Sequence, residues 1–410
     1  MGALEIAPDV FSVGAKDLNR KIFDALIPLP EGTSYNSYLV LGEQKNALID
    51  TVNPGFEKEL MLNVLEKISF EKLDYLIMNH AEPDHANAIP EILEEAKNAK
   101  LLASKMGAQV AKGYYEVPED RIEIVDETTR IPLGGKTLRF VDAPWLHWPE
   151  TMFTYLEEDA ILFPCDFFGQ HIGTKENFDY EMDWERLEEY AKRYFGEIML
   201  PFRSAGQKAL EKMKSLEIKT IAPSHGVIFT NPDKILVRYS SWTSGKLAKH
   251  ALIAYVSMWG SSEIMAKELE RKLREKGVLV SSYNLQEADL GEIARDLVDS
   301  ACIVIAAPTF LGGVHPLALN AASLAKALRP PAKYAALVSS YGWGPMAGRT
   351  ITEALKGTGI EMLGTVEVKA RPKKDDLEKI GALASIIAEK IGANGSEQSP
   401  GLRSIINPTG

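Results

Sequence analysis

The chain has 410 residues, a length that suits two or three domains rather than a single core. Its hydrophobic fraction of 45% and charged fraction of 25% are those of a globular protein, and its net charge of -11 argues against binding to nucleic acid, which relies on clustered Lys and Arg. The two cysteines, Cys165 and Cys302, are too few for a disulfide framework or a thiolate metal site, and the lack of a signal-peptide pattern or a membrane-length apolar run predicts a cytoplasmic protein.

The first part of the chain, to about residue 245, is predicted to be rich in short strands. These strands are expected at Asn46–Thr51, Leu73–Asn79, Lys100–Ala103, Arg121–Val125, Lys136–Asp142, Met152–Leu156 and Ala160–Pro164. Two helices are predicted, at Pro54–Ile68 and Pro90–Lys97, because proline is favoured in the first turn of a helix.

From Lys249 onward strands and helices alternate strictly, which predicts an α/β domain with a doubly wound parallel sheet. The expected strands are Ala251–Ser257, Val278–Tyr283, Ala301–Ala306, Tyr334–Ser339 and Gly364–Val368, and a helix is expected at Glu263–Lys276. We therefore predict one domain over residues 1–248, a second over 249–392, and a flexible C-terminal tail over 393–410, where Gly, Ser and Pro are frequent.

Four potential metal ligands lie within six residues, directly after the predicted strand Leu73–Asn79. They are His80, Glu82, Asp84 and His85. Three more, His147, Asp166 and His225, also follow predicted strands. An isolated histidine is more often structural, but this combination favours metal binding.

This pattern resembles the metallo-β-lactamase fold, whose hydrolase members carry HxHxDH where this chain has Glu82 at the second histidine. The change makes the ligand set more anionic and suits iron or manganese better than zinc, although affinity alone does not exclude zinc. The same substitution marks the flavodiiron protein family, which the sequence resembles. The resemblance implies an N-terminal αββα sandwich with one iron on His80, Glu82 and His147. It implies a second iron on Asp84, His85 and His225, with Asp166 bridging the two.

Several further residues are candidates for the surroundings of this centre. The candidate catalytic residues are Asp166, His171 and Tyr194, and the aromatic residues Trp145, Trp148, Phe167, Phe168 and Tyr194 are expected to keep the pocket dry. Asp50 is either a carboxylate that orients a ligand histidine or an ordinary strand-end turn residue, and Cys165 is either a ligand or a packing residue. Family members often carry an aromatic–His–Gly tripeptide near the N-terminus, where this chain has Phe23-Asp24-Ala25.

Three loops at the carboxyl ends of strands in the second domain resemble those of flavodoxin and predict an FMN site. They contain Ser257, Met258, Trp259, Gly260, Ser261 and Ser262; Pro308, Thr309, Phe310, Leu311, Gly312 and Gly313; and Ser340, Tyr341, Gly342, Trp343 and Gly344. Hydroxyls and N–H groups at a helix N-terminus can hold a phosphate, although N-capping is a simpler role for the serines of the first loop. The GK[ST] of a P-loop is absent.

The resemblance implies reduction of dioxygen to water, of nitric oxide to nitrous oxide, or of both. Electrons would pass through FMN from a separate rubredoxin-like protein or a reduced deazaflavin coenzyme, in a head-to-tail homodimer or homotetramer. Neither the preferred gas nor the donor follows from the sequence. Two other readings remain open at this point, namely a zinc hydrolase with an accessory flavodoxin module and a plain electron carrier.

Overall fold

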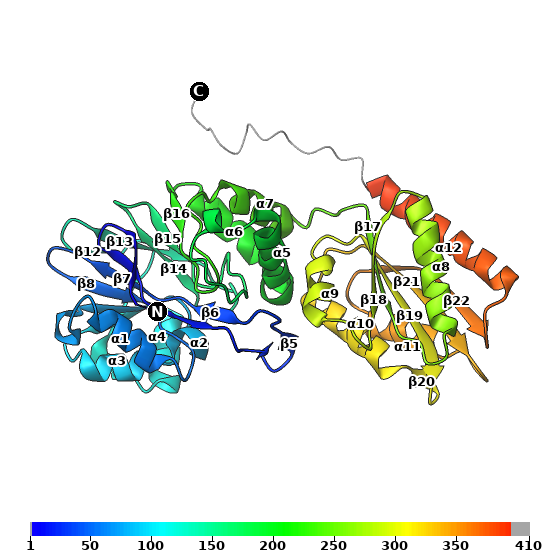
Figure 1. Cartoon of the computed structure of the whole chain (residues 1–410), viewed down its shortest axis with the longest axis horizontal. Coiled ribbons are helices and arrows are strands. Elements are labelled where there is room, and N and C mark those ends of the chain that lie inside the picture. Colours follow the sequence, from blue (N-terminus) through cyan, green and yellow to red (C-terminus); the bar gives the residue numbers. More distant parts are fainter. Residues whose placement is uncertain (1, 395–410) are drawn as a thin grey trace, which may run out of the picture. The chain divides into compact units, whose positions relative to one another are not determined.

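The computed structural model describes residues 2–394, and it divides the chain into two compact units, Met1–Ser244 and Gly245–Gly410 (Figure 1). The flexible tail predicted over residues 393–410 lies outside the described residues except for its first two positions. These two belong to the last helix, which ends at Asn394. Within residues 2–394 no helix combines the length and apolar character that a membrane span requires.

The first unit contains two facing sheets. The larger has the order β1 (Leu4–Ala7), β2 (Val10–Ser12), β7 (Tyr38–Leu41), β8 (Asn46–Ile49), β9 (Tyr75–Met78), β10 (Lys100–Ala103) and β11 (Ile122–Ile124). The smaller has the order β12 (Arg130–Pro132), β13 (Thr137–Asp142), β14 (Met152–Leu156), β15 (Ile161–Phe163) and β16 (Thr220–Ile221). Two small two-stranded sheets are formed by β3 (Ala15–Asp17) with β6 (Thr33–Tyr35), and by β4 (Ile22–Phe23) with β5 (Ile27–Pro28).

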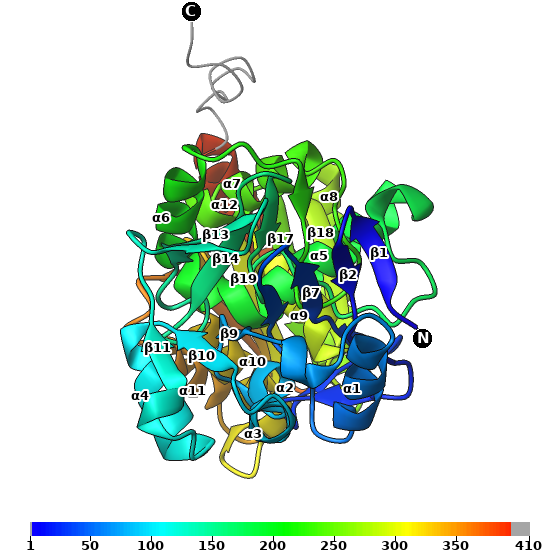
Figure 2. The same ribbon diagram turned by 90° about the vertical axis from the view of Figure 1, so that its left-hand side faces the viewer.

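Helices cover both outer faces of these sheets, so the unit is an αββα sandwich. The helices α1 (Glu57–Leu65), α2 (Pro83–Ala86), α3 (Ile89–Glu95) and α4 (Lys105–Tyr114) lie on one side, and α5 (Trp184–Tyr194), α6 (Arg203–Met213) and α7 (Asp233–Ser244) lie on the other (Figures 1 and 2). Successive side chains of a strand point to opposite faces of its sheet, so the unit has two separate hydrophobic cores. Ile49 and Ile77 pack between the two sheets with Phe140, whereas Leu48 and Leu76 pack against the helices.

The second unit has one parallel sheet in the order β18 (Leu279–Asn284), β17 (His250–Tyr255), β19 (Cys302–Phe310), β21 (Tyr334–Tyr341) and β22 (Glu361–Lys369). Counted along the chain this is the order 2-1-3-4-5 of flavodoxin-like domains. The short strand β20 (Gly313–Val314) pairs with the end of β19. The remaining helices are α8 (Ser261–Glu275), α9 (Leu290–Leu297), α10 (Pro316–Leu328), α11 (Ala347–Ala354) and α12 (Lys374–Asn394).

Two of the predicted flavin loops begin later than expected. β19 continues to Phe310, so Pro308, Thr309 and Phe310 belong to the strand rather than to the loop. Proline has no backbone N–H to donate and therefore usually ends a strand. Pro308 is tolerated in β19 because β17 stops pairing with β19 at Ala306, so no hydrogen bond between these two strands is lost at Pro308. β21 likewise runs through Ser340 to Tyr341. Helix α8 begins at Ser261, two residues before the prediction, because Gly260 adopts the left-handed conformation (φ 82°) and serves as its N-cap.

Candidate functional site

The ligand-rich segment His80–His85 starts where β9 ends, and its first residue is fixed by the residue before it. The Asn79 N–H and amide Nδ2 donate to Asp50 at 2.8 and 3.0 Å, and Thr154 Oγ1 donates to Asn79 Oδ1 at 2.7 Å. Asp50 therefore anchors the chain next to His80 and makes no hydrogen bond to a ligand histidine. Burial raises the pKa of the Asp50 carboxyl to about 6.

Four side chains converge in a first group of donor atoms. Glu82 Oε2 lies 2.9 Å from His147 Nε2 and 3.3 Å from His80 Nε2. Asp166 Oδ2 lies 3.5 Å from His80 Nε2 and 3.6 Å from His147 Nε2. One ligand atom from each of the four lies within 4.8 Å of every other, which is the spacing expected around a single cation.

Asp84, His85 and His225 form a second group, next to the other oxygen of Asp166. Asp84 Oδ1 lies 3.2 Å from His85 Nε2, and Asp84 Oδ2 lies 3.3 Å from His225 Nε2. Asp166 Oδ1 lies 3.0 Å from His85 Nε2 and 3.4 Å from His225 Nε2. The two oxygens of Asp166 thus face different groups, the arrangement of a carboxylate that bridges two metal ions.

The donor atoms of this cluster are poorly satisfied by the protein alone. Both oxygens of Asp84, Asp166 Oδ2 and the Nε2 atoms of His85 and His225 are buried and have no hydrogen-bond partner among the described residues. Leaving such an atom unpaired costs about 1–3 kcal/mol, and more when it is charged. The buried carboxylates of Asp84 and Asp166, and the partly buried Glu82, also need positive charge nearby. Two cations would satisfy both requirements, so the residues fit a dinuclear centre.

The electrostatics of the bridging carboxylate agree with this reading. Burial alone would raise the pKa of Asp166, but the charge of His85 and the close approach of the His225 and His80 rings outweigh it and hold that pKa well below its usual range. In the same way, hydrogen bonds from His147 and His80 overcome burial and lower the pKa of Glu82. Both side chains are therefore negatively charged at neutral pH.

Two ligand histidines are oriented through their outer nitrogens. His80 Nδ1 donates to Glu150 Oε1 at 2.7 Å, and the same oxygen accepts from the Ala81 N–H at 3.0 Å. His225 Nδ1 donates to the Ser34 carbonyl at 2.6 Å. These bonds turn Nε2 of each ring toward the cluster. Glu150 was not predicted as a site residue from the sequence. The one feature that could have indicated it is its position three residues after His147.

The Glu150→Gln variant tests this orienting role. We expect the metal content to fall and the activity that depends on it to drop about 10- to 100-fold, because the amide cannot supply the charge that strengthens the histidine as a ligand. Metal analysis and activity measurements of the purified variant measure both effects. Glu157→Gln, at the exposed residue that follows β14, is the matched control, and equal behaviour of the two variants would contradict the role.

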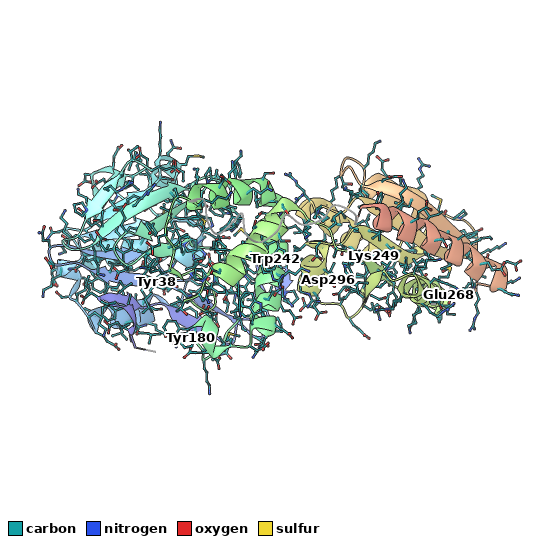
Figure 3. All side chains as sticks on the ribbon, turned by 90° about the horizontal axis from the view of Figure 1, so that it is seen from above. Tyr38, Tyr180, Trp242, Lys249, Glu268 and Asp296 are labelled. Carbon is teal, nitrogen blue, oxygen red and sulfur yellow. The ribbon has the colours of Figure 1, made fainter. Side chains whose placement is uncertain are left out.

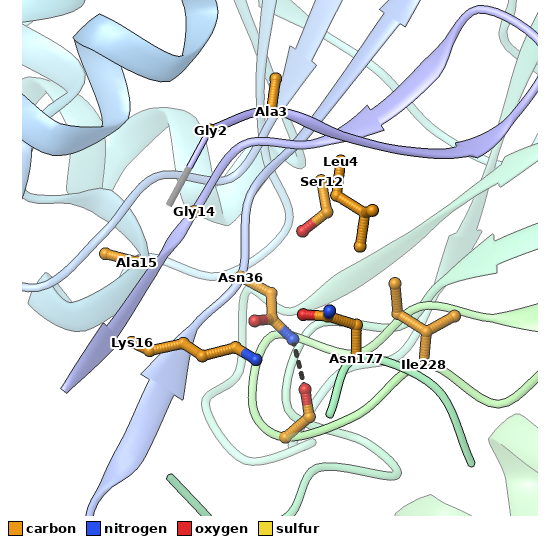
Figure 4. A pocket seen from close by; sticks show the side chains of 11 residues that line it. Gly2, Ala3, Leu4, Ser12, Gly14, Ala15, Lys16, Asn36, Asn177 and Ile228 are labelled. Atoms are coloured by element: carbon orange, nitrogen blue, oxygen red, sulfur yellow. Dashed lines mark hydrogen bonds between the residues drawn. The ribbon is translucent and has the colours of Figure 1, made fainter. Parts of the chain in front are cut away.

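The loop that carries His225 is held by Asn36, which follows β6. Figure 4 shows the Asn36 side chain with one of its hydrogen bonds. Asn36 Nδ2 donates to the Pro223 and Gly226 carbonyls, both at 2.9 Å, and the Asn36 N–H donates to the Ser224 carbonyl at 2.7 Å. Three bonds from one residue therefore fix the backbone on both sides of His225. A cavity of about 300 Å³ is lined by Asn36 together with Lys16 and Asn177.

His171 and Tyr194 lie beside the centre in different ways. Tyr194 OH donates to Asp166 Oδ1 at 2.9 Å, so it touches the bridging carboxylate directly. His171 is absent from both donor groups; its Nδ1 lies 3.0 Å from Thr33 Oγ1, and its ring packs 4.8 Å from that of His225. Burial lowers the pKa of His171 well below its usual range, and the neighbouring His225 adds to this, so the ring is neutral.

The aromatic surroundings differ from the expectation. Trp148 lies edge-on to His80 with ring centroids 5.1 Å apart, but Trp145 is 54% exposed. Phe167 and Phe168 pack on Tyr239 instead of the pocket, at 4.9 and 4.4 Å. The wall beside His171 and His225 is formed by Phe23, at 4.5 and 6.1 Å.

Cys165 lies within 4.8 Å of ligand atoms of His85 and Asp166. Burial raises the pKa of its thiol well above the usual range, so the sulfur stays protonated. A protonated thiol is a poor metal ligand, which favours the packing role.

The three loops of the second unit meet at the carboxyl edge of its sheet. Ser262 Oγ of the first loop lies 3.3 Å from Ser340 Oγ of the third, and Ser257 Oγ is buried without a hydrogen-bond partner among the described residues. Open space lies beside four glycines of these loops, where an added Cβ would meet no atom within 4 Å: Gly260, Gly312, Gly342 and Gly344. Trp259 and Trp343 are 90% and 83% exposed, so their flat faces are free to stack on a ring. These features fit FMN.

Comparisons with known proteins agree with the fold of both units. Residues 33–226 match the family model described as ODP family beta lactamase, and residues 253–381 match that of Flavodoxin. The chain is 35% identical to the nitric oxide reductase of Moorella thermoacetica over 94% of this chain and 98% of that protein. It is 33% identical to the coenzyme F420H(2) oxidase of Methanothermobacter marburgensis, over 85% of this chain and 89% of that one. The solved structure of the rubredoxin oxygen:oxidoreductase from Desulfovibrio gigas superposes with a TM-score of 0.93 at 29% identity, covering 96% of this chain and 100% of that one.

Proposed function

Since the chain belongs to the flavodiiron protein family, we propose that it is an oxidoreductase that reduces dioxygen to water, nitric oxide to nitrous oxide, or both. The observation that carries the proposal is the position of Asp166, whose two oxygens face two separate groups of nitrogen and oxygen donors. Dioxygen takes up four electrons and four protons to give two waters, and two nitric oxide molecules take up two of each to give nitrous oxide and water.

The ligand roles follow from the two groups. His80, Glu82 and His147 would hold one iron, Asp84, His85 and His225 the other, and Asp166 would join them. Two non-haem irons bound there supply two electrons and adjacent open positions for a small gas molecule, and FMN supplies the further electrons. The carboxylate at position 82 favours iron over the zinc of a hydrolase, and the full ligand set argues against a plain electron carrier.

The remaining residues of the pocket orient groups and exclude water. Tyr194 keeps Asp166 in place through its hydroxyl, while Phe23 and Trp148 cover the ligand histidines with apolar surface. His171, neutral and with Nε2 free of hydrogen bonds among the described residues, presents a polar atom to the pocket. It is therefore suited to donate or accept a hydrogen bond to a bound gas molecule.

Electrons are proposed to come from a rubredoxin-like protein or a reduced deazaflavin coenzyme, as the names of two relatives suggest. We also propose a head-to-tail homodimer or homotetramer in the cytoplasm, on the basis of the family resemblance. Metal analysis and a visible spectrum of the purified protein, followed by turnover with each gas and the same reduced donor, test the function. Zinc without iron, or flavin without gas reduction, would contradict it.

The flavin site is tested by Ser257→Ala. Because Ser257 Oγ is buried and unpaired among the described residues, we expect it to donate to the FMN phosphate. A hydrogen bond to a charged group contributes about 1.5–3 kcal/mol, so the affinity for FMN should fall about 10- to 100-fold while the iron content stays unchanged. Titrating the flavin-free protein with FMN measures the affinity. Ser323→Ala on the exposed face of α10 should have no effect, and an unchanged affinity in Ser257→Ala would remove Ser257 from the site.

A further inference from the structure

A short basic segment, residues 369–374, follows the last strand of the second unit. Four of its six residues are cationic and exposed: Lys369, Arg371, Lys373 and Lys374. None of the four forms an ion pair with another described residue. Several other cations of the unit are paired, for example Lys267 with Glu263 on α8, and Lys390 with Glu361. An unpaired run of this kind is unusual in a chain whose net charge is -11.

The segment leaves the sheet beside the third flavin loop. Lys369 is opposite Tyr341 in the register of β22 with β21, and the Ala370 N–H donates to the Tyr341 carbonyl at 2.7 Å. Parallel strands bring these carboxyl ends to the same edge of the sheet. The cations therefore begin next to the loop that contains Trp343.

The backbone of the segment is fixed at both ends. Ala370 adopts a left-handed conformation (φ 63°) and is tied to β21, and the Lys373 N–H donates to Asp376 Oδ2 at 3.1 Å at the start of α12. Pro372 restricts the chain between them. The four side chains thus extend from a defined path, so little backbone entropy is lost when a partner binds.

We propose that this basic segment docks an acidic one-electron carrier protein next to the FMN. The proposal rests on the proposed function. Each donor molecule loses one electron, and two encounters together reduce the flavin by two electrons, with two protons taken from water. A chain of net negative charge repels an acidic donor at long range, so a local positive surface is needed to steer the donor to the flavin.

A protein fits this surface better than a small anionic donor does. Six residues span up to about 20 Å when extended, which is longer than one phosphate or carboxylate group but matches the face of a small protein. Trp343, 83% exposed, adds apolar surface beside the charges. Apolar contact surrounded by charged residues is typical of protein interfaces.

The test is the rate at which a reduced rubredoxin of net negative charge bleaches the flavin on rapid mixing at low ionic strength. In the variant K369Q/R371Q/K373Q/K374Q we expect the second-order rate constant to fall at least about 10-fold and to lose most of its salt dependence. The control R271Q/K272Q/R274Q/K276Q makes the same charge change in the last turns of α8, near Glu268 (Figure 3), and at its C-cap Lys276, where exposed ion pairs contribute little stability. Its rate constant should stay within about 2-fold of the wild-type value.

Two further measurements separate the proposal from its premise. Gas turnover with chemically reduced flavin should be equal in the wild type and both variants, and its absence in the wild type would overturn the proposed function instead. Flavin reduction by reduced coenzyme F420 should be unaffected by the basic-segment variant. A wild-type rate with rubredoxin, or an equal loss of rate with both donors, would overturn the docking proposal.

Discussion

Replacing Asp166 with alanine should abolish gas reduction and leave FMN bound. The substitution removes both oxygens that face the two donor groups, and it leaves Tyr194 OH without its acceptor. Changes in the outer contacts of metal ligands already cost about 10- to 100-fold, so loss of a shared ligand should lower turnover by more than about 100-fold. Turnover with each gas, iron content and the flavin spectrum of the purified variant measure the result.

A graded series of substitutions distinguishes bridging from simple packing. Asp166→Asn keeps the shape of the side chain but not its charge, and it should lose nearly as much activity as the alanine variant. Tyr194→Phe removes a single hydrogen bond to Asp166 and should cost about 10-fold at most. Wild-type turnover in Asp166→Ala, or loss of flavin with retained iron, would show that Asp166 does not bridge the two groups.

The ligand set was accessible from the sequence because it follows from local order. His80, Glu82, Asp84 and His85 occur in one loop, and His147, Asp166 and His225 each follow a strand end. The structure brings all seven together in adjacent groups of donor atoms. Glu150 and Asn36 were not predictable, because their roles depend on contacts between residues about 70 and 190 positions apart.

The fold was predictable from the sequence where helices and strands are long enough to show a periodic pattern of apolar residues. The parallel sheet of the second unit and most strands from β8 onward were expected within a few residues. The seven strands before Asn46 were not, because each has two to four residues and so shows no clear alternation. Phe23 lies in one of these, β4, which is why its contact with His171 and His225 was missed.

Replacing Glu82 with histidine should convert the centre from iron to zinc and abolish gas reduction. The change restores the HxHxDH pattern and removes one of three anionic ligands, and the resulting nitrogen-rich set binds zinc more strongly than ferrous iron. Zinc cannot change its oxidation state, so turnover should fall more than about 100-fold. Elemental analysis of protein expressed with both metals present, together with gas-uptake rates, measures both outcomes.

The negative charge of Glu82 explains why Glu82→His should have an effect beyond the change in side-chain shape. Glu82 Oε2 contacts both His147 and His80, and hydrogen bonds from them keep its pKa below the usual range, so it brings a full negative charge to the first group. Glu82→Gln removes the charge with little change in shape and should also lose iron, whereas Glu82→Asp should retain part of it. Glu91→His, on the exposed face of α3, controls for an added histidine. If Glu82→His kept both its iron and its turnover, the carboxylate would not be what selects the metal.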